Sequence, residues 1–165
     1  DKAIAILKYN PDSQKLIHSF KYRDQLHILN YLVNLMSNIG KDIIQEADII
    51  IPVAMYKYKL LKRGYNQAAL LAMKIASKNK ILYLPQVLIK KKNSPAQAGL
   101  KKEQRINNIK NTFELNTKFI KRIQGKKILL IDDVITTGST IDECCKILCK
   151  ASPSKIFVLT LAKRI

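Results

Sequence analysis

The chain carries one segment whose residue types and spacing could bind a phosphorylated sugar. It runs from Ile128 to Thr140 and begins with four apolar residues that end in two adjacent carboxylates, Asp132 and Asp133. A short polar run follows at the start of an expected helix: Thr136, Thr137, Gly138, Ser139 and Thr140. In open α/β sheets, ligands bind at the carboxyl ends of strands, where these side chains would project.

The polar run is suited to holding a phosphate. A helix N-terminus supplies unpaired N–H donors and the positive end of the helix dipole, Gly138 permits close backbone approach, and the hydroxyls add donors. The two carboxylates would repel a phosphate, so they need another partner, such as sugar hydroxyls or a metal-chelated sugar phosphate. The alternative, in which Ser139 or Thr140 caps a helix beside a solvated acidic loop, does not explain the double acid. A P-loop is excluded, because the chain has no Gly-x-x-x-x-Gly-Lys-Ser/Thr string.

A site of this kind needs a parallel sheet, and the pattern of the chain predicts one. The expected strands are Ala3–Tyr9, Asp48–Val53, Ile81–Ile89, Lys127–Ile131 and Ile156–Leu161. The expected helices are an interrupted stretch from Gln14 to Glu46, a helix marked by Ala68, Leu71, Ala72 and Ile75, and Thr140–Lys150. The β-α-β order of the last third predicts a parallel sheet with helices on its faces. A Rossmann-like domain with another ligand is the alternative fold.

Three segments add detail to this plan. Asn10–Ser13 predicts a turn and a helix cap. Pro85 interrupts Ile81–Ile89, which is therefore expected to be two short pieces or an edge strand. Lys90–Thr112 is polar and basic, and we expect it to be mobile or ordered by a ligand.

The net charge favours polyanionic partners. With 30 Lys and Arg against 12 Asp and Glu, the formal net charge is +18, which suits nucleic acid or a multiply phosphorylated small molecule. A/T-rich codon usage can also spread lysines along a chain and give the same net charge. The charge alone therefore does not decide whether the partner is a polyanion.

Length and hydrophobic pattern bound the class of protein. The 165 residues match one compact domain. No stretch has the length of a membrane span and no secretory signal is present, so the chain is expected to be cytoplasmic. The first residue is Asp1 rather than Met, which suggests a trimmed or incomplete chain.

The cysteines and histidines give no sign of a metal site. Cys144, Cys145 and Cys149 lack CxxC spacing and are interpreted as buried small apolar residues. The helical face expected to be buried consists of Ile141, Cys144, Cys145 and Leu148. His18 and His27 lie in the early helical region, where an ordinary surface or packing role is expected.

The segment Ile128–Thr140 resembles the phosphoribosyl pyrophosphate (PRPP) signature of the phosphoribosyltransferases. Two further segments are similar to motifs of the ComF family, the competence-associated branch of these proteins. One is Ile51-Pro52-Val53 followed by Leu60–Gln67, which contains Arg-Gly-Tyr-Asn-Gln. The other follows a P-x-Q-x-x-L…R-x-x-N…F spacing with Pro95, Gln97, Leu100, Arg105, Asn108 and Phe113. The resemblance covers about Ala3 to Lys163.

The resemblance implies a type I phosphoribosyltransferase fold, an α/β domain with a central, mostly parallel sheet flanked by helices and a small N-terminal strand and helix extension. It implies a single domain over residues 1–165, with the extension at 1–46 and the PRPP-binding core at 47–165. Asp132 and Asp133 would take the ribose 2′ and 3′ hydroxyls. The 5′-phosphate would lie against the polar run Thr136, Thr137, Gly138, Ser139 and Thr140.

The same resemblance gives roles to two other segments. Arg63 and Gly64 would bind the pyrophosphate, because a guanidinium fork matches phosphate oxygens and the glycine lets the chain turn beside it; a surface salt bridge is the alternative for Arg63. Gln97, Arg105 and Asn108 would belong to a flexible loop that closes over PRPP and excludes water, with a solvated loop as the alternative. The lysines expected on this loop are Lys90, Lys91, Lys92, Lys101 and Lys102. Mg²⁺ would be carried by PRPP, without a direct protein ligand.

The sequence departs from the family pattern in three places. A histidine commonly follows the first core strand, where this chain reads Ala54-Met55-Tyr56, and a cysteine-rich zinc-binding segment found in many members is absent from this sequence. The position that holds a catalytic carboxylate in some purine-type relatives is Thr136 here. The catalytic residues and the acceptor therefore stay unassigned.

Two functions remain open at this point. One is an active phosphoribosyltransferase that passes phosphoribosyl from PRPP to an unidentified nitrogen acceptor with release of pyrophosphate. The other is a competence or DNA-uptake protein that binds single-stranded DNA and uses PRPP as a regulatory ligand. The best local candidate for stacking on bases is a group of tyrosines and cations, Tyr56, Tyr58 and Tyr65 among Lys57, Lys59, Lys62 and Arg63. A homodimer is a further open partner.

Overall fold

The structure, a computed structural model, describes residues 2–20, 28–92 and 111–164, with the backbone alone at 18–20. Several predicted features lie outside the described residues: Gln97, Arg105, Asn108, Lys101, Lys102, His27 and the side chain of His18.

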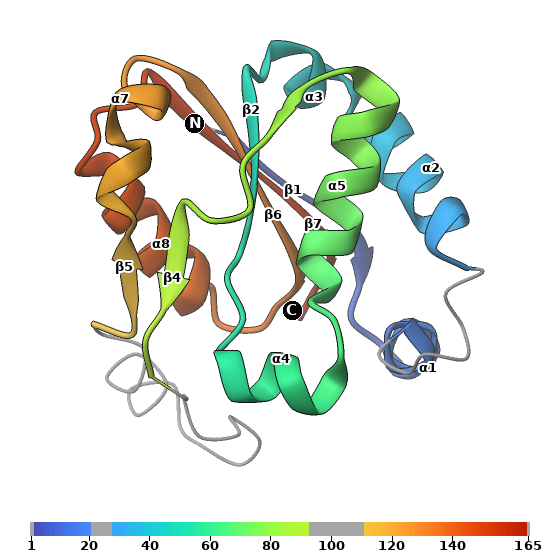
Figure 1. Cartoon of the computed structure of the whole chain (residues 1–165). Helices are drawn as coiled ribbons and strands as arrows, with labels where there is room; N and C mark the ends of the chain where they lie inside the picture. Colours follow the sequence, from blue (N-terminus) through green and yellow to red (C-terminus); the bar gives the residue numbers. More distant parts are fainter. Residues whose placement is uncertain (1, 21–27, 93–110, 165) are drawn as a thin grey trace.

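Five parallel strands form the central sheet in the order β1-β7-β6-β2-β3 (Figure 1). Their bounds are β1 Lys2–Lys8, β2 Ile49–Pro52, β3 Leu82–Tyr83, β6 Lys127–Ile135 and β7 Lys155–Lys163. A separate antiparallel pair joins β4 (Leu88–Lys90) to β5 (Phe113–Leu115). The predicted parallel sheet is confirmed, and the strand of the N-terminal extension forms one of its edges.

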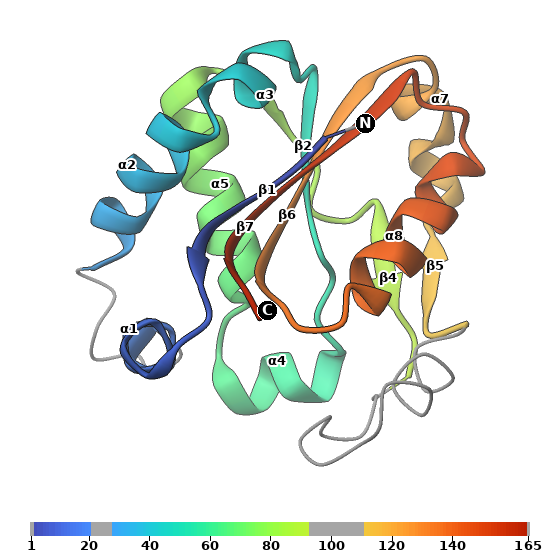
Figure 2. The ribbon, with the colours of Figure 1, turned by 180° about the vertical axis from the view of Figure 1, so that it is seen from behind.

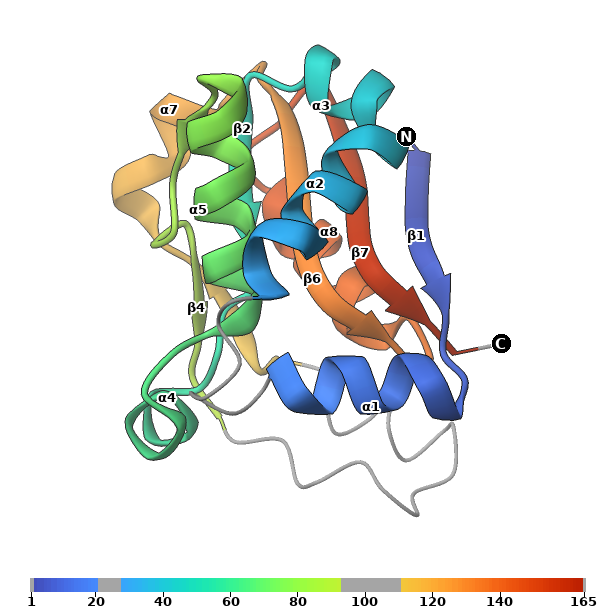
Figure 3. The same cartoon turned by 90° about the vertical axis from the view of Figure 1, so that its right-hand side faces the viewer.

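Helices cover both faces of the sheet, because successive strand residues point to opposite sides. One face carries α1 (Pro11–Phe20), α2 (Leu29–Ile39), α3 (Lys41–Glu46) and α5 (Gln67–Asn79), and the other carries α7 (Ile120–Ile123), α8 (Ser139–Cys149) and the β4–β5 pair (Figure 1 and Figure 3). Leu129 and Ile131 of β6 point into the hydrophobic core on the side of α2 and α5. Ile128 and Leu130 point into the core on the side of α8 and the β4–β5 pair. The continuous apolar run of β6 is therefore buried on both sides.

The chain changes its direction of winding between β2 and β6. From β2 it passes through α5 to β3, whereas from β6 it passes through α8 to β7 on the opposite side (Figure 2). Open α/β sheets bind ligands at the carboxyl ends of strands beside such a switch point. The ends of β2 and β6 are thus where a site is expected from topology alone.

Strand β6 is longer than the sequence predicts. The expected strand ends at Ile131, but β6 continues to Ile135, and Asp132 pairs with Thr160 of β7. Pairing with β2 on the other edge ends where Pro52 meets Ile131. Because β7 alone extends the pairing, Asp132 and Asp133 lie on a strand with one open edge rather than in a loop.

The shorter elements agree with the prediction in part. Asn10 caps α1, since the Ser13 N–H donates to Asn10 Oδ1 at 2.9 Å. The segment Ile81–Ile89 is two pieces, β3 and β4, which belong to different sheets. Four elements were not predicted. Helix α4 (Lys57–Arg63) has no buried residue and therefore no apolar periodicity, and the other three are short: β5, the 3-10 helix Thr117–Phe119 and α7.

Helix α8 corrects the interpretation of the cysteines. Cys144 is buried, but Cys145 is half-buried and Cys149 is exposed. Ile147, rather than Cys145, completes the buried face with Ile141, Cys144 and Leu148. Burial raises the pKa of Cys144 well above its ordinary value and that of Cys145 to about 11, so both thiols stay protonated at neutral pH.

None of the helices in the described part of the chain has the length and apolar character needed to cross a membrane.

Candidate functional site

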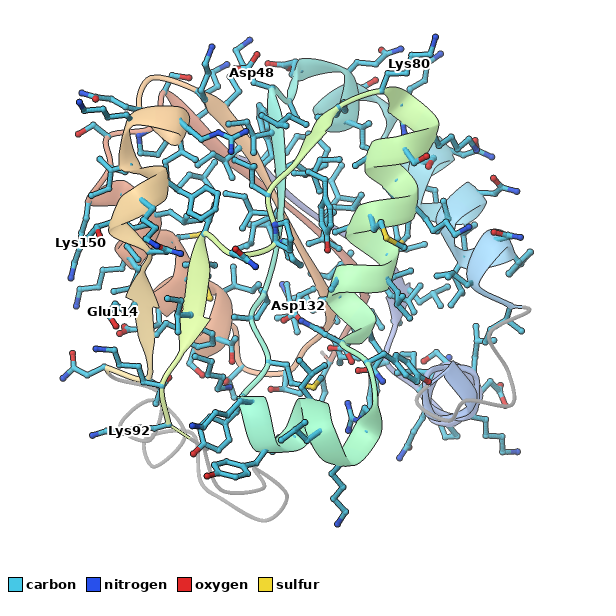
Figure 4. All side chains as sticks on the ribbon, in the orientation of Figure 1. Asp48, Lys80, Lys92, Glu114, Asp132 and Lys150 are labelled. Carbon is cyan, nitrogen blue, oxygen red and sulfur yellow. The ribbon has the colours of Figure 1, made fainter. Side chains whose placement is uncertain are left out.

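A cavity of about 340 Å³ lies where β2 and β6 end. Figure 4 shows Asp132 in this region, near the first turns of α5. The charged, amide and threonine side chains that line the cavity are Lys59, Arg63, Asn66, Gln67, Lys90, Asp132, Asp133, Thr136 and Thr140. The structure therefore brings together Asp132, Asp133, Arg63 and two of the five residues predicted to hold a phosphate.

The two carboxylates are fixed by the backbone that follows each of them. The Asp133 N–H donates to Asp132 Oδ1 at 2.9 Å, and the Val134 N–H donates to Asp133 Oδ1 at 2.8 Å. Burial, and next the charge of Asp133, raise the pKa of Asp132 well above its ordinary value. A pair of this kind favours hydroxyl ligands, because a hydroxyl can donate to a carboxylate oxygen without bringing a further negative charge into the site.

The turn before α8 has the conformation that the glycine predicts. Gly138 precedes the helix with a φ of 84°, in the left-handed region. Thr137 Oγ1 and Ser139 Oγ lie 2.8 Å apart in a hydrogen bond. Thr136 and Thr140 line the cavity of Asp132, and Ser139 is buried.

Thr137 and Gly138 line a second cavity of about 310 Å³ together with Thr136 and Asp142. One carboxylate, Asp142, and one cation, Lys163, line that space, whereas three cations line the first cavity beside Asp132 and Asp133. The larger number of cations favours the side of the turn that faces Asp132 for an anionic ligand.

Arg63 reaches the cavity from the end of α4. This helix ends at Gly64, whose φ of 85° turns the chain toward α5. Arg63 Nη1 donates to Gln67 Oε1 at 2.8 Å, which is a contact inside the site rather than a surface salt bridge. Gly64 itself does not line the cavity and serves the turn.

Asn66 links the start of α5 to the segment after β2 through two backbone groups. Its Oδ1 accepts from the Ala68 N–H at 3.1 Å, which caps α5, and its Nδ2 donates to the carbonyl of Val53 at 3.0 Å. The start of α5 is thereby tied to the segment that follows β2. The family motif Arg-Gly-Tyr-Asn-Gln thus builds one wall of the cavity.

Lys90 supplies a further cation from the opposite wall. Its Nζ lies 4.8 Å from the ring centroid of Phe113. Burial, and next the nearby charge of Lys59, lower the pKa of Lys90, while Asp132 acts in the other direction. An anionic ligand would restore the favourable environment that this ammonium lacks.

A third cavity, of about 540 Å³, adjoins the first and has a mainly apolar lining. The two share Ala54, Met55, Asn66 and Lys90. Ala54 and Met55 make part of the wall between the two cavities apolar, whereas Asn66 and Lys90 add polar groups to it.

Four polar residues of the first cavity were not predicted as individual ligand contacts: Asn66, Gln67, Lys90 and Tyr9. Gln67 was recognised only as part of a motif, and Lys90 was assigned to the flexible loop although it lies in β4. Tyr9 lines the cavity because its N–H donates to the carbonyl of Lys163 at 2.8 Å, which extends the pairing of β1 with β7. The motif gave a signal for Gln67, but the sequence gave none for Tyr9, whose place depends on strand order.

The donor set around Asp132 fits a magnesium ion that enters with a ligand. Within the described ranges, no group of three His, Cys, Asp or Glu side chains is arranged to hold a metal ion. Mg²⁺ is usually held by one or two carboxylates together with substrate phosphates. The ligand's own phosphates would therefore carry such an ion, with Asp132 and Asp133 lying in the same cavity beside Thr136 and Thr140.

Comparisons with known proteins extend over most of the chain. Residues 34–165 match the family model described as phosphoribosyl transferase domain. Over 168 aligned positions the chain is 33% identical to Competence protein F of Haemophilus influenzae, an alignment that covers 99% of this chain and 73% of that protein. It is 25% identical to the DNA utilization protein YhgH of Escherichia coli, in an alignment that covers 98% of this chain and 72% of that protein.

Among solved structures, the hypoxanthine phosphoribosyl transferase of Trypanosoma cruzi is similar with a TM-score of 0.49 and 11% identity, over 89% of this chain and 66% of that one. The parallel sheet and the family match together identify a type I phosphoribosyltransferase fold. Because the family model spans most of the chain and the similarity to Competence protein F spans nearly all of it, the chain belongs to the phosphoribosyl transferase domain family, in its ComF branch.

Proposed function

We propose that this protein binds PRPP with Mg²⁺ at the ends of β2 and β6 and transfers its phosphoribosyl group to a nitrogen acceptor. The observation that carries the proposal is the distribution of charge in the first cavity, where two carboxylates on β6 lie among hydroxyls, a helix N-terminus and three cations. PRPP has the complementary distribution, because its ribose hydroxyls lie between a 5′-phosphate and a pyrophosphate.

Each part of PRPP then has a partner. Asp132 and Asp133 bind the ribose 2′ and 3′ hydroxyls. The 5′-phosphate lies against the turn from Thr136 to Thr140 and the N-terminus of α8. Lys59, Arg63 and Lys90 neutralise the pyrophosphate, and Arg63 has the planar fork that matches two phosphate oxygens.

The reaction exchanges one bond at C1 of the ribose. The bond from C1 to the pyrophosphate oxygen breaks with its electron pair leaving on pyrophosphate, a bond from C1 to the acceptor nitrogen forms, and that nitrogen loses a proton. The three cations stabilise the charge that develops on the leaving group. Mg²⁺ bound to the pyrophosphate would add to the same neutralisation.

Calorimetric titration of PRPP with Mg²⁺ tests the proposal. The wild type should bind, and the double variant Asp132→Asn/Asp133→Asn should lose binding while staying folded. Asp42→Asn/Glu46→Gln is the matched control, since it removes two exposed acids of α3 and changes the net charge equally. A well-folded wild type that does not bind PRPP would refute the proposal.

A second candidate function is binding of single-stranded DNA along α4. The rings of Tyr56 and Tyr58 lie 5.5 Å apart, the Lys57 ammonium lies 5.2 Å from the Tyr58 ring, and Tyr58 is 61% exposed. Exposed rings beside cations are the platform on which bases of single strands stack. The names of two relatives, Competence protein F and DNA utilization protein YhgH, support a role in DNA binding. The residues of the first cavity give no separate support for that role.

Fluorescence anisotropy with a labelled oligonucleotide separates the two functions. Binding that weakens steeply with salt and responds to PRPP would favour the DNA role with PRPP as a regulatory ligand. Release of pyrophosphate in the presence of one nucleobase or amine, without oligonucleotide binding, would leave the transferase as the sole function.

A further inference from the structure

The third cavity, of about 540 Å³, is not used by the proposed reaction. Residues of β2, α4, α5 and β4 and of the segments beside them line it, and the lining is mainly apolar. Ligand pockets for small molecules have volumes of about 300 to 1,000 Å³ and are lined mostly by apolar side chains with a few polar groups. The apolar members of this lining are Pro52, Ala54, Met55, Leu60, Ala69, Pro85, Leu88 and Ile89.

Two of these apolar side chains are open to solvent. Leu60 on α4 is 40% exposed and Ile89 on β4 is 42% exposed, and neither of them lines the first cavity. A ligand with an apolar body that covers them gains the free energy of removing that surface from water. Leu60 and Ile89 can therefore be changed without altering a residue that lines the first cavity.

The amide groups of the lining are already bonded within the protein. Asn116 Nδ2 donates to the carbonyl of Gln86 at 3.1 Å, and its Oδ1 accepts from the Lys118 N–H at 3.2 Å. Both ends of the Asn66 amide are engaged in the same way. The two prolines have no N–H to offer. A ligand that needs several hydrogen-bonding edges would thus meet few free partners here.

Two cations give this cavity its charge. Lys57 and Lys90 line it, and none of the described residues in the lining is an Asp or Glu. Lys57 is exposed, whereas Lys90 is half-buried, and burial and next the charge of Lys59 lower the pKa of Lys90. An anionic group would be attracted to both ammonium groups. The cavity therefore suits an apolar body that carries one acid group.

We propose that the third cavity is a regulatory site for an apolar organic anion, which competes with the ligand of the first cavity for Lys90. The two cavities share Ala54, Met55, Asn66 and Lys90, and Lys90 is the cation among them. Because one ammonium cannot fully neutralise two anions, binding in either cavity weakens binding in the other. The competition rests on the proposed function, whereas occupation of the third cavity does not.

Fluorescence titration with anilinonaphthalene sulfonate tests the site, and phenylnaphthylamine, its uncharged analogue, measures the contribution of the acid group. The sulfonate should bind the wild type more tightly than the analogue, and Lys57→Gln should bring the two affinities closer together. Leu60→Gln/Ile89→Gln should weaken sulfonate binding by about tenfold. Leu61→Gln/Leu82→Gln is the matched control, because these leucines are 77% and 45% exposed and lie outside the cavity lining.

The competition is measured by titrating each ligand in the presence of the other. PRPP with Mg²⁺ should weaken binding of the sulfonate, and the sulfonate should weaken PRPP binding by the same factor, since coupling between two sites is reciprocal. In Leu60→Gln/Ile89→Gln, PRPP affinity should equal that of the wild type and no longer respond to the sulfonate at the same concentration.

Two results would overturn the site: an equal loss of sulfonate binding in the control variant, or tighter binding of the uncharged analogue. Unchanged sulfonate affinity at saturating PRPP would refute the competition. A wild type that binds the sulfonate at Leu60 and Ile89 but does not bind PRPP would refute the proposed function and leave the site standing. If Leu60→Gln/Ile89→Gln does not fold, Leu60→Ala/Ile89→Ala removes the same apolar surface.

Discussion

At the scale of single residues, burial decides how the acids of β6 behave. Asp132 is buried beside a second carboxylate, and both effects favour its neutral form. Thr160, its pairing partner on β7, is also buried, and its hydroxyl has no hydrogen-bond partner among the described residues. Asp132 lines the first cavity, so the protein keeps a buried acid there at a cost in stability, as expected of a binding site.

We predict that Asp132→Asn raises the Tm at neutral pH. With the folded-state pKa of Asp132 above its ordinary value of 3.8, ionisation favours the unfolded chain, so stability is lost as pH rises from that value through the folded pKa. In a domain of this size the Tm should rise by about 2–4 °C for each kcal/mol gained in the free energy of unfolding. This increase in Tm should fade toward pH 4. Thermal unfolding between about pH 4 and 8 measures it.

Asp133→Asn is the comparison for that measurement. It removes the neighbouring charge but keeps the buried acid, and burial is the larger cause of the raised pKa of Asp132. Its gain in Tm should therefore be smaller. An equal gain in both variants would mean that repulsion, rather than burial, dominates the pair.

Lys90 should behave as a ligand-binding cation rather than as a stabilising one. Its lowered pKa means that its charge is costly in the free protein, so Lys90→Met should leave the Tm unchanged or higher. Loss of its charge should weaken PRPP binding by about tenfold. In the wild type, affinity should fall as alkaline pH passes the lowered pKa of Lys90. Lys91→Met is the matched control, because exposed Lys91 pairs with Glu114; equal weakening of PRPP binding by both variants would contradict the assignment.

At the scale of elements, the connection from β6 to α8 depends on one backbone conformation. Gly138 has a φ of 84°, and a Cβ there would meet only Asp142 Oδ2 at an ordinary 3.7 Å. The cost of Gly138→Ala therefore comes from the left-handed backbone and amounts to about 1–2 kcal/mol. Relief of this strain by rotation of the turn would also move the N–H groups, so we expect PRPP binding to be lost.

Gly125→Ala is the control for the stability lost when an alanine adopts the left-handed backbone conformation. Gly125 also has a positive φ, of 69°, and space for a Cβ, but it lies before β6, at the end away from the cavity. Denaturant unfolding should show a similar loss of stability in both alanine variants, whereas calorimetry should show lost PRPP binding only for Gly138→Ala. Retained binding by Gly138→Ala would mean that the turn tolerates another conformation.

At the scale of the whole molecule, the net charge of +18 makes any binding of nucleic acid depend on salt. If α4 is the contact surface, Lys57→Gln/Lys62→Gln should reduce the slope of log affinity against log salt by about 1.4 for a single strand. Lys74→Gln/Lys78→Gln on α5 removes the same charge from another exposed position and should leave the slope unchanged. Equal slopes for the two variants would show that the charge acts without a defined surface.

The sequence by itself determined the parallel sheet and the glycine turn of Thr136–Thr140 before α8, and it predicted that Asp132, Asp133 and Arg63 lie near that turn. These features are local, since β-branched runs, a glycine between hydroxyl residues and a short motif each leave a pattern within a few neighbouring residues. The extension of β6 through the acids could not be predicted, because it depends on which strand continues beside it. Helix α4 left no pattern, because it buries no face.

Only the tertiary structure decided which side chains share the cavity. Strand order brings the ends of β2 and β6 together, and with them Arg63 and Gln67 on one side and Thr136 and Thr140 on the other. Lys90 and Tyr9 join from β4 and the end of β1, which are distant in the sequence. The burial of Gln67 and the raised pKa of Asp132 exist only in the folded protein, because burial is a property of packing and not of any segment alone.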